Sequence, residues 1–252
     1  MVTFFCNLGE FYWAFAAIYG ILIGRKIAAI LGSKERIMVI LFDLDGTLTD
    51  SGEGITKCAQ LALDHFGIHI EDRTQLRCFV GPPLRESFPR FGVPEDRVEE
   101  AIAVFRSRYL TVGKFENVPY PGIENLLRTL KEQGHRLYVA TSKPESTAVE
   151  ILDKFALSPY FTRICGASMD SGRDSKEAVI AYLLELEGRE QKTVMVGDTA
   201  FDVIGASAHG IPTIGVSWGY GDVDEMLKAG ACSIAHTPEE LEKLLRQEAE
   251  RG

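Results

Sequence analysis

Two aspartates separated by one residue follow a short apolar segment of the chain. Val39–Phe42 contains only apolar side chains, and Asp43 and Asp45 come directly after it, followed by Gly46 and Thr47. A strand buried on both faces of a parallel sheet has this continuous apolar composition. Carboxylates at the carboxyl end of such a strand lie where open α/β sheets bind ligands. Because unpaired buried charges are costly, we expect a metal ion or a positively charged group beside these acids.

Thr141, Lys176, Asp198 and Asp202 are further candidates, although each also has an ordinary structural explanation. Thr141 and Asp198 each follow an apolar segment and could cap a helix amino terminus. A lysine such as Lys176 is usually exposed to solvent, and Asp202 could be a first-turn acid stabilised by the helix dipole. Since all strands of a parallel sheet end at one edge, the acids after the first strand can meet Thr141 and Asp198 there.

The elements that would position these residues alternate between helix and strand from residue 122 onward. This alternation is typical of an α/β fold with a doubly wound parallel sheet. Apolar positions at helical spacing predict helices over 123–131 and 175–187. The sequences that begin at Ser142 and Thr237 have the capping-box form of helix starts. Strands are predicted at 137–140, 161–166, Thr193–Gly197 and 211–216, with a short edge strand at 232–235.

The segment 52–119 has helical periodicity and no strand pattern. It interrupts the α/β pattern directly after the first strand. An all-helical insertion at this point predicts a small cap domain over a core made of residues 38–51 and 120–252. Prolines and a glycine within 119–122 mark the return to the core.

Residues 1–37 differ in composition from the rest of the chain. An uncharged apolar run over 11–24 is shorter than the ~20 residues needed to span a bilayer, and it lacks the basic region and cleavage site of a signal peptide. Three interpretations stay open: an upstream extension absent from a mature protein that starts at Met38, a membrane anchor, and an extra helix packed on the domain. Membrane association is expected only through this segment.

The overall composition limits the classes of function. The 252 residues are 46% hydrophobic and 25% charged, which is ordinary for a globular protein. A net charge of −9 argues against binding of nucleic acid through a global basic field, but not against a small phosphorylated ligand. Five scattered cysteines without a Cys-x-x-Cys pair disfavour a disulfide framework or a zinc site. They favour the reducing cytoplasm, with membrane association as the alternative.

These residues occur in four motifs, in an order that resembles the haloacid dehalogenase-like superfamily over residues 38 to about 245. Further stretches at 81–84, 119–122, 141–144 and 215–221 resemble its phosphoglycolate phosphatase-like group, which includes 5'-nucleotidase-like members. The four motifs are Asp43-Leu-Asp45-Gly-Thr-Leu-Thr, Thr141 after Leu-Tyr-Val-Ala, Asp-Ser-Lys176-Glu-Ala-Val-Ile, and Gly197-Asp198-Thr-Ala-Phe-Asp202.

The resemblance implies a Mg²⁺-dependent phosphatase that works through an aspartyl-phosphate. Asp43 would be the nucleophile, and Asp45 would protonate the leaving group and then deprotonate water. Asp43, Asp198 and the backbone carbonyl of Asp45 would hold Mg²⁺. Asp202 would be a further metal ligand or would orient Lys176.

The resemblance also implies contacts to a small phosphorylated metabolite. Thr141, Ser142 and Lys176 would hold the phosphoryl oxygens. Arg85 in the cap would reach a carboxylate or second anion of the substrate, with an ordinary surface arginine as the alternative. Phosphoglycolate is the first substrate expected, and a nucleoside monophosphate the second. A phosphomutase and a non-catalytic binding protein on the same fold are the alternatives in function, and the oligomeric state is open.

Overall fold

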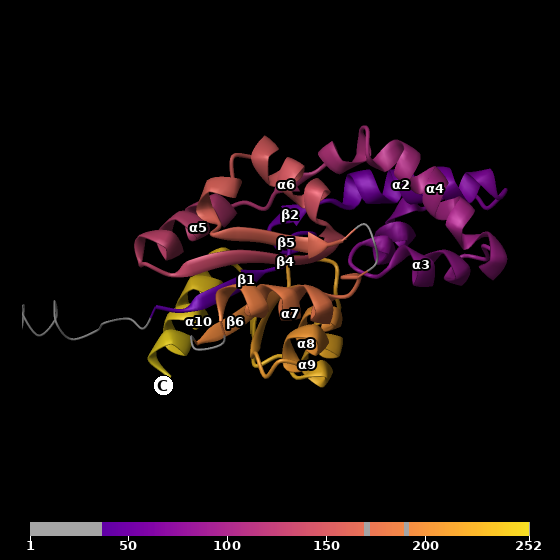
Figure 1. Ribbon diagram of the computed structural model, residues 1–252. Helices are drawn as coiled ribbons and strands as arrows, with labels where there is room; N and C mark the ends of the chain where they lie inside the picture. The colour runs from indigo at the N-terminus through magenta and orange to yellow at the C-terminus, as the bar shows by residue number, and fades with distance from the viewer. Residues whose placement is uncertain (1–36, 169–171, 189–191, 252) are drawn as a thin grey trace, which may run out of the picture. The chain divides into compact units, whose positions relative to one another are not determined.

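A six-stranded parallel sheet forms the centre of the protein, which a computed structural model describes for residues 37–168, 172–188 and 192–251. The strand order is β5-β4-β1-β6-β7-β8 (Figure 1), so the predicted doubly wound α/β fold is confirmed. The strands are β1 (Val39–Phe42), β4 (Arg136–Pro144), β5 (Arg163–Ala167), β6 (Thr193–Gly197), β7 (Thr213–Val216) and β8 (Ser233–Ala235).

The strand β1 lies in the middle of the sheet, between β4 and β6. Successive strands β4 and β5 add on one side of it, and β6, β7 and β8 add on the other. The chain order therefore reverses between β1 and β6, and this reversal is where doubly wound sheets form a ligand-binding crevice. Asp43 and Asp198 directly follow these two strands.

Helices cover both faces of the sheet (Figure 1). Ile40 and Phe42 of β1 face one apolar cluster, while Val39 and Leu41 face the other, which explains why every residue of this strand is apolar and buried. The first face carries α5 (Ile123–Glu132), α6 (Glu145–Lys154) and α10 (Pro238–Glu250), and the second carries α7 (Lys176–Glu187) and α8 (Ala200–Ser207), with α9 (Val223–Ala229) beside α8.

The predicted capping box at Ser142 is wrong. Strand β4 continues to Pro144, and Pro144 occupies the N-cap position of α6 without a side-chain capping bond. The pairing of β4 with β5 shifts register between Ala140 and Pro144, so pairing across the sheet overrides the local capping pattern. The cap predicted at Thr237 is confirmed, because its side chain accepts a hydrogen bond from the Glu240 N–H.

Residues between the first strand and α5 form a helical cap with its own apolar cluster. Phe88 packs edge-on against both Phe79 and Phe105 within that cluster. The cap contains α2 (Gly52–His65), α3 (Leu84–Arg90) and α4 (Val98–Tyr109), with short 3₁₀ turns at Arg73–Phe79, Glu95–Arg97 and Gly113–Phe115.

The all-helical description of 52–119 needs one correction. The short strand β3 (Val118–Pro119) pairs antiparallel with β2 (Thr49–Asp50), so a two-stranded ribbon joins the cap to the core. Strands of two residues are too short to show the alternation of apolar and polar residues by which a strand is recognised.

The predictions for residues 1–37 lie outside the described residues, except for Ile37, whose side chain is exposed. Residues 37–252 form one compact unit, and Met38 is buried at its start. Among the helices of the described ranges, none combines the length and apolar composition that a membrane span requires.

Candidate active site

Four carboxylates lie buried at the carboxyl edge of the sheet. Asp43, Asp198 and Asp202 each offer an oxygen within 4.8 Å of the other two. Asp45 is also buried, with 9% of its surface exposed. The fold thus brings the acids of the first and last motifs into one cluster.

Lys176 is a buried cation between two of these acids. Its Nζ lies 2.6 Å from Oδ1 of Asp43 and 2.7 Å from Oδ1 of Asp202, and it donates to the backbone carbonyl of Ala140 over 2.9 Å. Burial by itself would lower the pKa of Lys176, but Asp202 and Asp43 outweigh this and raise it above the ordinary value. The alternative of a solvated surface lysine is therefore wrong.

Asp202 serves both the start of α8 and Lys176. Its Oδ2 accepts hydrogen bonds from the N–H of Thr199 over 3.0 Å and from the Thr199 hydroxyl over 2.8 Å. Thr199, not Asp198, is the N-cap residue, which excludes the helix-cap explanation of Asp198. Oδ1 of Asp202 accepts no hydrogen bond of regular geometry and faces the ammonium of Lys176. The Lys176 ammonium is therefore the cationic partner of that oxygen.

Asp198 is held from two sides by the surrounding loops. The Thr47 hydroxyl donates to its Oδ1 over 3.3 Å, and the Tyr220 N–H donates to its Oδ2 over 2.8 Å. Glycines permit this close approach, because a Cβ would lie 2.1 Å from Oδ2 of Asp198 if placed on Gly46 and 2.3 Å if placed on Gly219. Gly46 also has a φ of +84°, which favours glycine.

Lys143, which the sequence analysis did not select, forms a buried ion pair with Asp45. Its Nζ lies 2.8 Å from Oδ1 and 2.7 Å from Oδ2 of Asp45. The hydroxyl of Tyr109, at the end of cap helix α4, contacts the same ammonium. The only sequence signal was the position of Lys143 two residues after Thr141, and its partners lie in distant segments.

The charges of the cluster do not balance. Four carboxylates, those of Asp43, Asp45, Asp198 and Asp202, face the two ammonium groups of Lys143 and Lys176. Burial raises the pKa of Asp43 to about 6, against the opposing effect of Lys176. Burial also raises the pKa of Asp198 well above its ordinary value, and the neighbouring Asp202 and Asp43 add to this rise. A divalent cation would compensate the excess negative charge.

Of the other residues predicted to bind substrate, Thr141 and Ser142 lie near the acidic cluster and Arg85 lies at the surface. Thr141 is buried near the cluster, and its hydroxyl accepts a hydrogen bond from the Lys143 N–H over 3.3 Å. Ser142 is half-buried beside it. Arg85 is not brought to the cluster: its side chain is 72% exposed and pairs with Glu99 over 3.0 Å.

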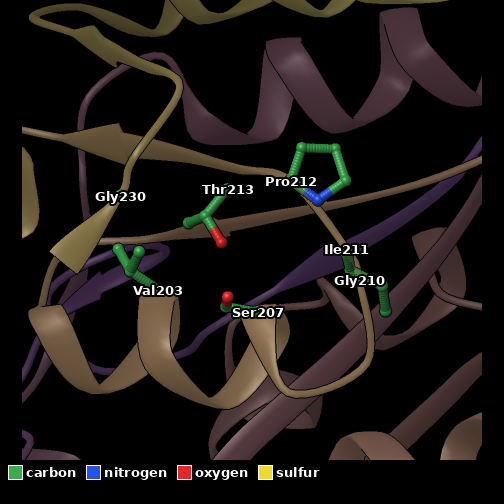
Figure 2. A pocket seen from close by; sticks show the side chains of 7 residues that line it. All are labelled: Val203, Ser207, Gly210, Ile211, Pro212, Thr213 and Gly230. Carbon is green, nitrogen blue, oxygen red and sulfur yellow. The ribbon is translucent and has the colours of Figure 1, made fainter.

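Two surface hollows lie apart from the acids, and no predicted site residue lines either of them. One of them has a volume of about 280 Å³ and lies between α8 and the start of β7. Figure 2 shows the residues that line it, which are Val203, Ser207, Gly210, Ile211, Pro212, Thr213 and Gly230. The other, of about 460 Å³, is lined by Phe115, Glu150, Asp153 and Lys154. The carboxylate cluster, by contrast, is buried.

Comparison with known proteins places this arrangement in a family. The family model described as haloacid dehalogenase-like hydrolase matches residues 40–216. The chain is 45% identical over 189 residues to the 5'-nucleotidase of Pseudomonas aeruginosa, which covers 74% of this chain and 86% of that protein. It is 34% identical over 184 residues to the phosphoglycolate phosphatase of Aquifex aeolicus, covering 72% of this chain and 85% of that protein.

A third relative has a solved structure. The chain is 42% identical over 214 residues to the tyrosine-protein kinase PtkA of Mycobacterium tuberculosis, covering 84% of this chain and 73% of that protein. The structure of that kinase superposes with a TM-score of 0.74 and covers 84% of this chain and 99% of the solved one. With the four motifs gathered around one buried acidic cluster, the chain belongs to the haloacid dehalogenase-like hydrolases and is an enzyme of the phosphoric monoester hydrolase type.

Proposed function

We propose that this protein hydrolyses a small phosphate monoester through an aspartyl-phosphate formed on Asp43, with Mg²⁺ as its cofactor. The position of Asp43 is the observation that best supports this function. Its carboxylate is buried, with the Lys176 ammonium 2.6 Å from one oxygen and two further carboxylates nearby. A buried acid with a strongly perturbed pKa at a sheet switch point is a candidate nucleophile.

The proposed reaction has two steps. A carboxylate oxygen of Asp43 attacks phosphorus in line, the ester P–O bond breaks, and the leaving oxygen takes a proton from Asp45. Water then attacks phosphorus of the aspartyl-phosphate and gives a proton to Asp45. This second step releases phosphate and restores the Asp43 carboxylate.

Positive charge is needed near Asp43 because a carboxylate and a phosphate dianion repel each other. Two unit charges at ~4 Å interact with about 4 kcal/mol at an effective dielectric of ~20. The Lys176 ammonium offsets part of this repulsion, and it would bind the phosphoryl oxygens together with the Thr141 hydroxyl.

The donor set fits a hard divalent cation. Asp43, Asp198 and Asp202 supply carboxylate oxygens of the kind Mg²⁺ prefers, and the Asp45 carbonyl stays a predicted further ligand. When bound, Mg²⁺ would supply the charge that neutralises the phosphoryl group. Asp202, which also contacts Lys176, would then combine the two roles that the sequence left open.

Among the substrates, we place a nucleoside monophosphate ahead of phosphoglycolate, which reverses the order expected from the sequence. The 5'-nucleotidase relative shares more identity with this chain than the phosphoglycolate phosphatase does. In addition, Arg85, the residue expected to contact a substrate carboxylate or second phosphate, pairs with Glu99 at the surface. This arrangement also weakens support for a phosphomutase, which must bind a second phosphate.

A substrate panel with Mg²⁺ tests the proposed function. Initial rates would be compared for nucleoside monophosphates, phosphoglycolate and sugar phosphates, in wild type and in Asp43→Asn. Hydrolysis that requires Mg²⁺ and disappears in Asp43→Asn is expected. Full activity of Asp43→Asn would exclude Asp43 as nucleophile. ATP with a tyrosine peptide belongs in the panel because one relative is named a kinase.

A further inference from the structure

The side chain of Lys143 enters the acidic cluster because β4 is irregular near its end. The register of β4 against β5 shifts between Ala140 and Pro144. Within this stretch the Lys143 N–H donates to the Thr141 hydroxyl over 3.3 Å. Irregularities of this kind redirect side chains near active sites. As a result, Lys143 is buried at the site and its side chain is only 5% exposed.

The contact between Lys143 and Asp45 involves both carboxylate oxygens. Nζ lies 2.8 Å from Oδ1 and 2.7 Å from Oδ2. An ammonium group carries three donors and no acceptor, so it can contact both oxygens together. A carboxylate held at both oxygens has a restricted orientation. Lys143 therefore determines where Asp45 presents its oxygens.

The same ammonium group is also in contact with the cap. Tyr109 is the last residue of α4, and its hydroxyl contacts Nζ of Lys143. The Tyr109 ring is fixed by stacking on Phe105, with ring centroids 5.3 Å apart. Because Tyr109 belongs to the cap and Lys143 to the core, any movement of the cap that admits a substrate must change this contact.

We propose that Lys143 is a positioning residue for Asp45, and that the Tyr109 hydroxyl completes this arrangement only while the cap lies over the core. The inference rests on the proposed function, in which Asp45 carries the proton. Its consequence is that proton transfer to the leaving group is fastest while the cap is closed. When the cap opens, Lys143 loses the Tyr109 hydroxyl, one of its two partners, and holds the carboxylate of Asp45 less firmly.

The dependence of the rate on the leaving group tests this role. A nitrophenolate leaves without a proton, whereas the alkoxide of a nucleoside monophosphate requires one. First-turnover rates for p-nitrophenyl phosphate and a nucleoside monophosphate therefore report separately on attack by Asp43 and on proton donation by Asp45. General acid catalysis contributes roughly 10²- to 10⁴-fold.

Lys143→Met is expected to lower the first-turnover rate for the nucleoside monophosphate by roughly 10- to 100-fold, which is part of the full general-acid contribution. The rate for the nitrophenyl ester should fall far less. KM should change little for either ester. Lys143→Arg should restore part of the rate, because a guanidinium also contacts both oxygens of a carboxylate. Tyr109→Phe, which keeps the ring, should give the same selectivity with a smaller loss of roughly fivefold, the size of one hydrogen bond.

Two matched variants control for general effects of the substitutions. Lys192→Met removes a lysine paired with Glu248 over 3.2 Å, and Tyr138→Phe removes a hydroxyl bonded to Glu187 over 2.7 Å. Neither touches the acidic cluster, so both should keep the wild-type ratio of the two rates. Thermal unfolding would establish that every variant is folded.

The possible outcomes separate this inference from the proposed function. Equal losses for both esters in Lys143→Met, a change confined to KM, or an unchanged rate would each overturn the positioning role. If Asp43→Asn stays active, the proposed function itself fails. If Asp43→Asn is inactive while Lys143→Met keeps the wild-type rate ratio, only the role of Lys143 is wrong.

Discussion

The backbone N–H of Tyr220 donates to Oδ2 of Asp198 over 2.8 Å. The hydroxyl of the same tyrosine accepts a hydrogen bond over 2.8 Å from the N–H of Gly52, the first residue of cap helix α2. It also contacts Asp50 in β2. One residue thus connects a carboxylate of the acidic cluster with the segment through which the chain enters the cap.

Substitution of Tyr220 by phenylalanine separates these two connections. Tyr220→Phe removes the contacts to Gly52 and Asp50 but keeps the backbone bond to Asp198. A lost hydrogen bond costs about 1 kcal/mol, roughly a fivefold change in an equilibrium. We expect kcat/KM to fall by about this factor while the Mg²⁺ affinity measured by calorimetry stays unchanged.

A large loss of Mg²⁺ affinity in Tyr220→Phe would contradict this separation. Tyr160→Phe is the matched control, because its hydroxyl donates only to Glu124 over 3.2 Å at the surface. This control should leave both kcat/KM and Mg²⁺ affinity at the wild-type level.

A methyl group at Gly219 should damage the acidic cluster directly. The new Cβ would lie 2.3 Å from Oδ2 of Asp198 and 2.4 Å from the carbonyl oxygen of Gly46, so the loop or the carboxylate must move. We expect Gly219→Ala to weaken Mg²⁺ binding by roughly 10- to 100-fold, as for other groups that orient metal ligands. Equilibrium dialysis or calorimetry would measure this.

Gly188→Ala provides the comparison for Gly219→Ala. A Cβ at Gly188 would meet nothing within 4 Å, although its φ of +82° strains any side chain. Gly188→Ala should lower the free energy of unfolding by about 1 kcal/mol and leave Mg²⁺ affinity unchanged. If both variants bind Mg²⁺ like wild type, steric crowding of Asp198 is not important for the metal site.

Binding of Mg²⁺ should depend on pH in a defined direction. The pKa of Asp43 is raised from an ordinary 3.8 to about 6 by burial, and that of Asp198 is raised as well. At low pH the metal-free carboxyls hold protons that a cation must displace, so the affinity for Mg²⁺ should rise with pH through about 6. Calorimetry at several pH values, in buffers of different ionisation enthalpy, would measure both affinity and proton release.

Two results would count against this account of the pH dependence. One is an affinity that does not change between about pH 5 and about pH 8, and the other is binding without proton release near pH 6. Asp198→Asn supplies the control, since it should abolish binding over the whole range.

A chain that begins at Met38 should fold and act like the full-length protein. Residues 37–252 form one compact unit, and Met38 is buried at the start of β1. We expect kcat/KM to be unchanged and Tm to shift by less than about 4 °C, which corresponds to ~1 kcal/mol for a domain of this size. A shorter chain that unfolds or loses activity would show that the first residues contribute to the domain.

Much of the core could be predicted because its signals are local. The bounds of β1 and β6 agree with the prediction, since strands buried on both faces must be apolar throughout and end where polar residues begin. Asp43 and Asp198 follow those strands, so the topology of a parallel sheet was sufficient to bring them together.

Other features depend on contacts between distant segments, so the local sequence was not sufficient to predict them. Lys143 is separated from Asp45 by 98 residues and from Tyr109 by 34 residues, so its burial follows only from the folded arrangement. Ser142 has the sequence of a helix cap, but pairing with β5 keeps it in a strand. The side chain of Arg85 pairs with Glu99 and not with the acidic cluster. Helical periodicity in the sequence does not predict this pairing.

The ribbon of β2 and β3 is a place at which the cap could be exchanged for that of a relative. The chain leaves the core through Thr49–Asp50 and returns through Val118–Pro119, and these two strands pair with each other. Since both ends of the insertion lie side by side, the intervening residues can be exchanged without stretching the sheet, as is general for insertions whose termini are close together. Transplanting the cap of a relative at this ribbon would therefore give chimeras that keep the acidic cluster and differ in the substrates they admit.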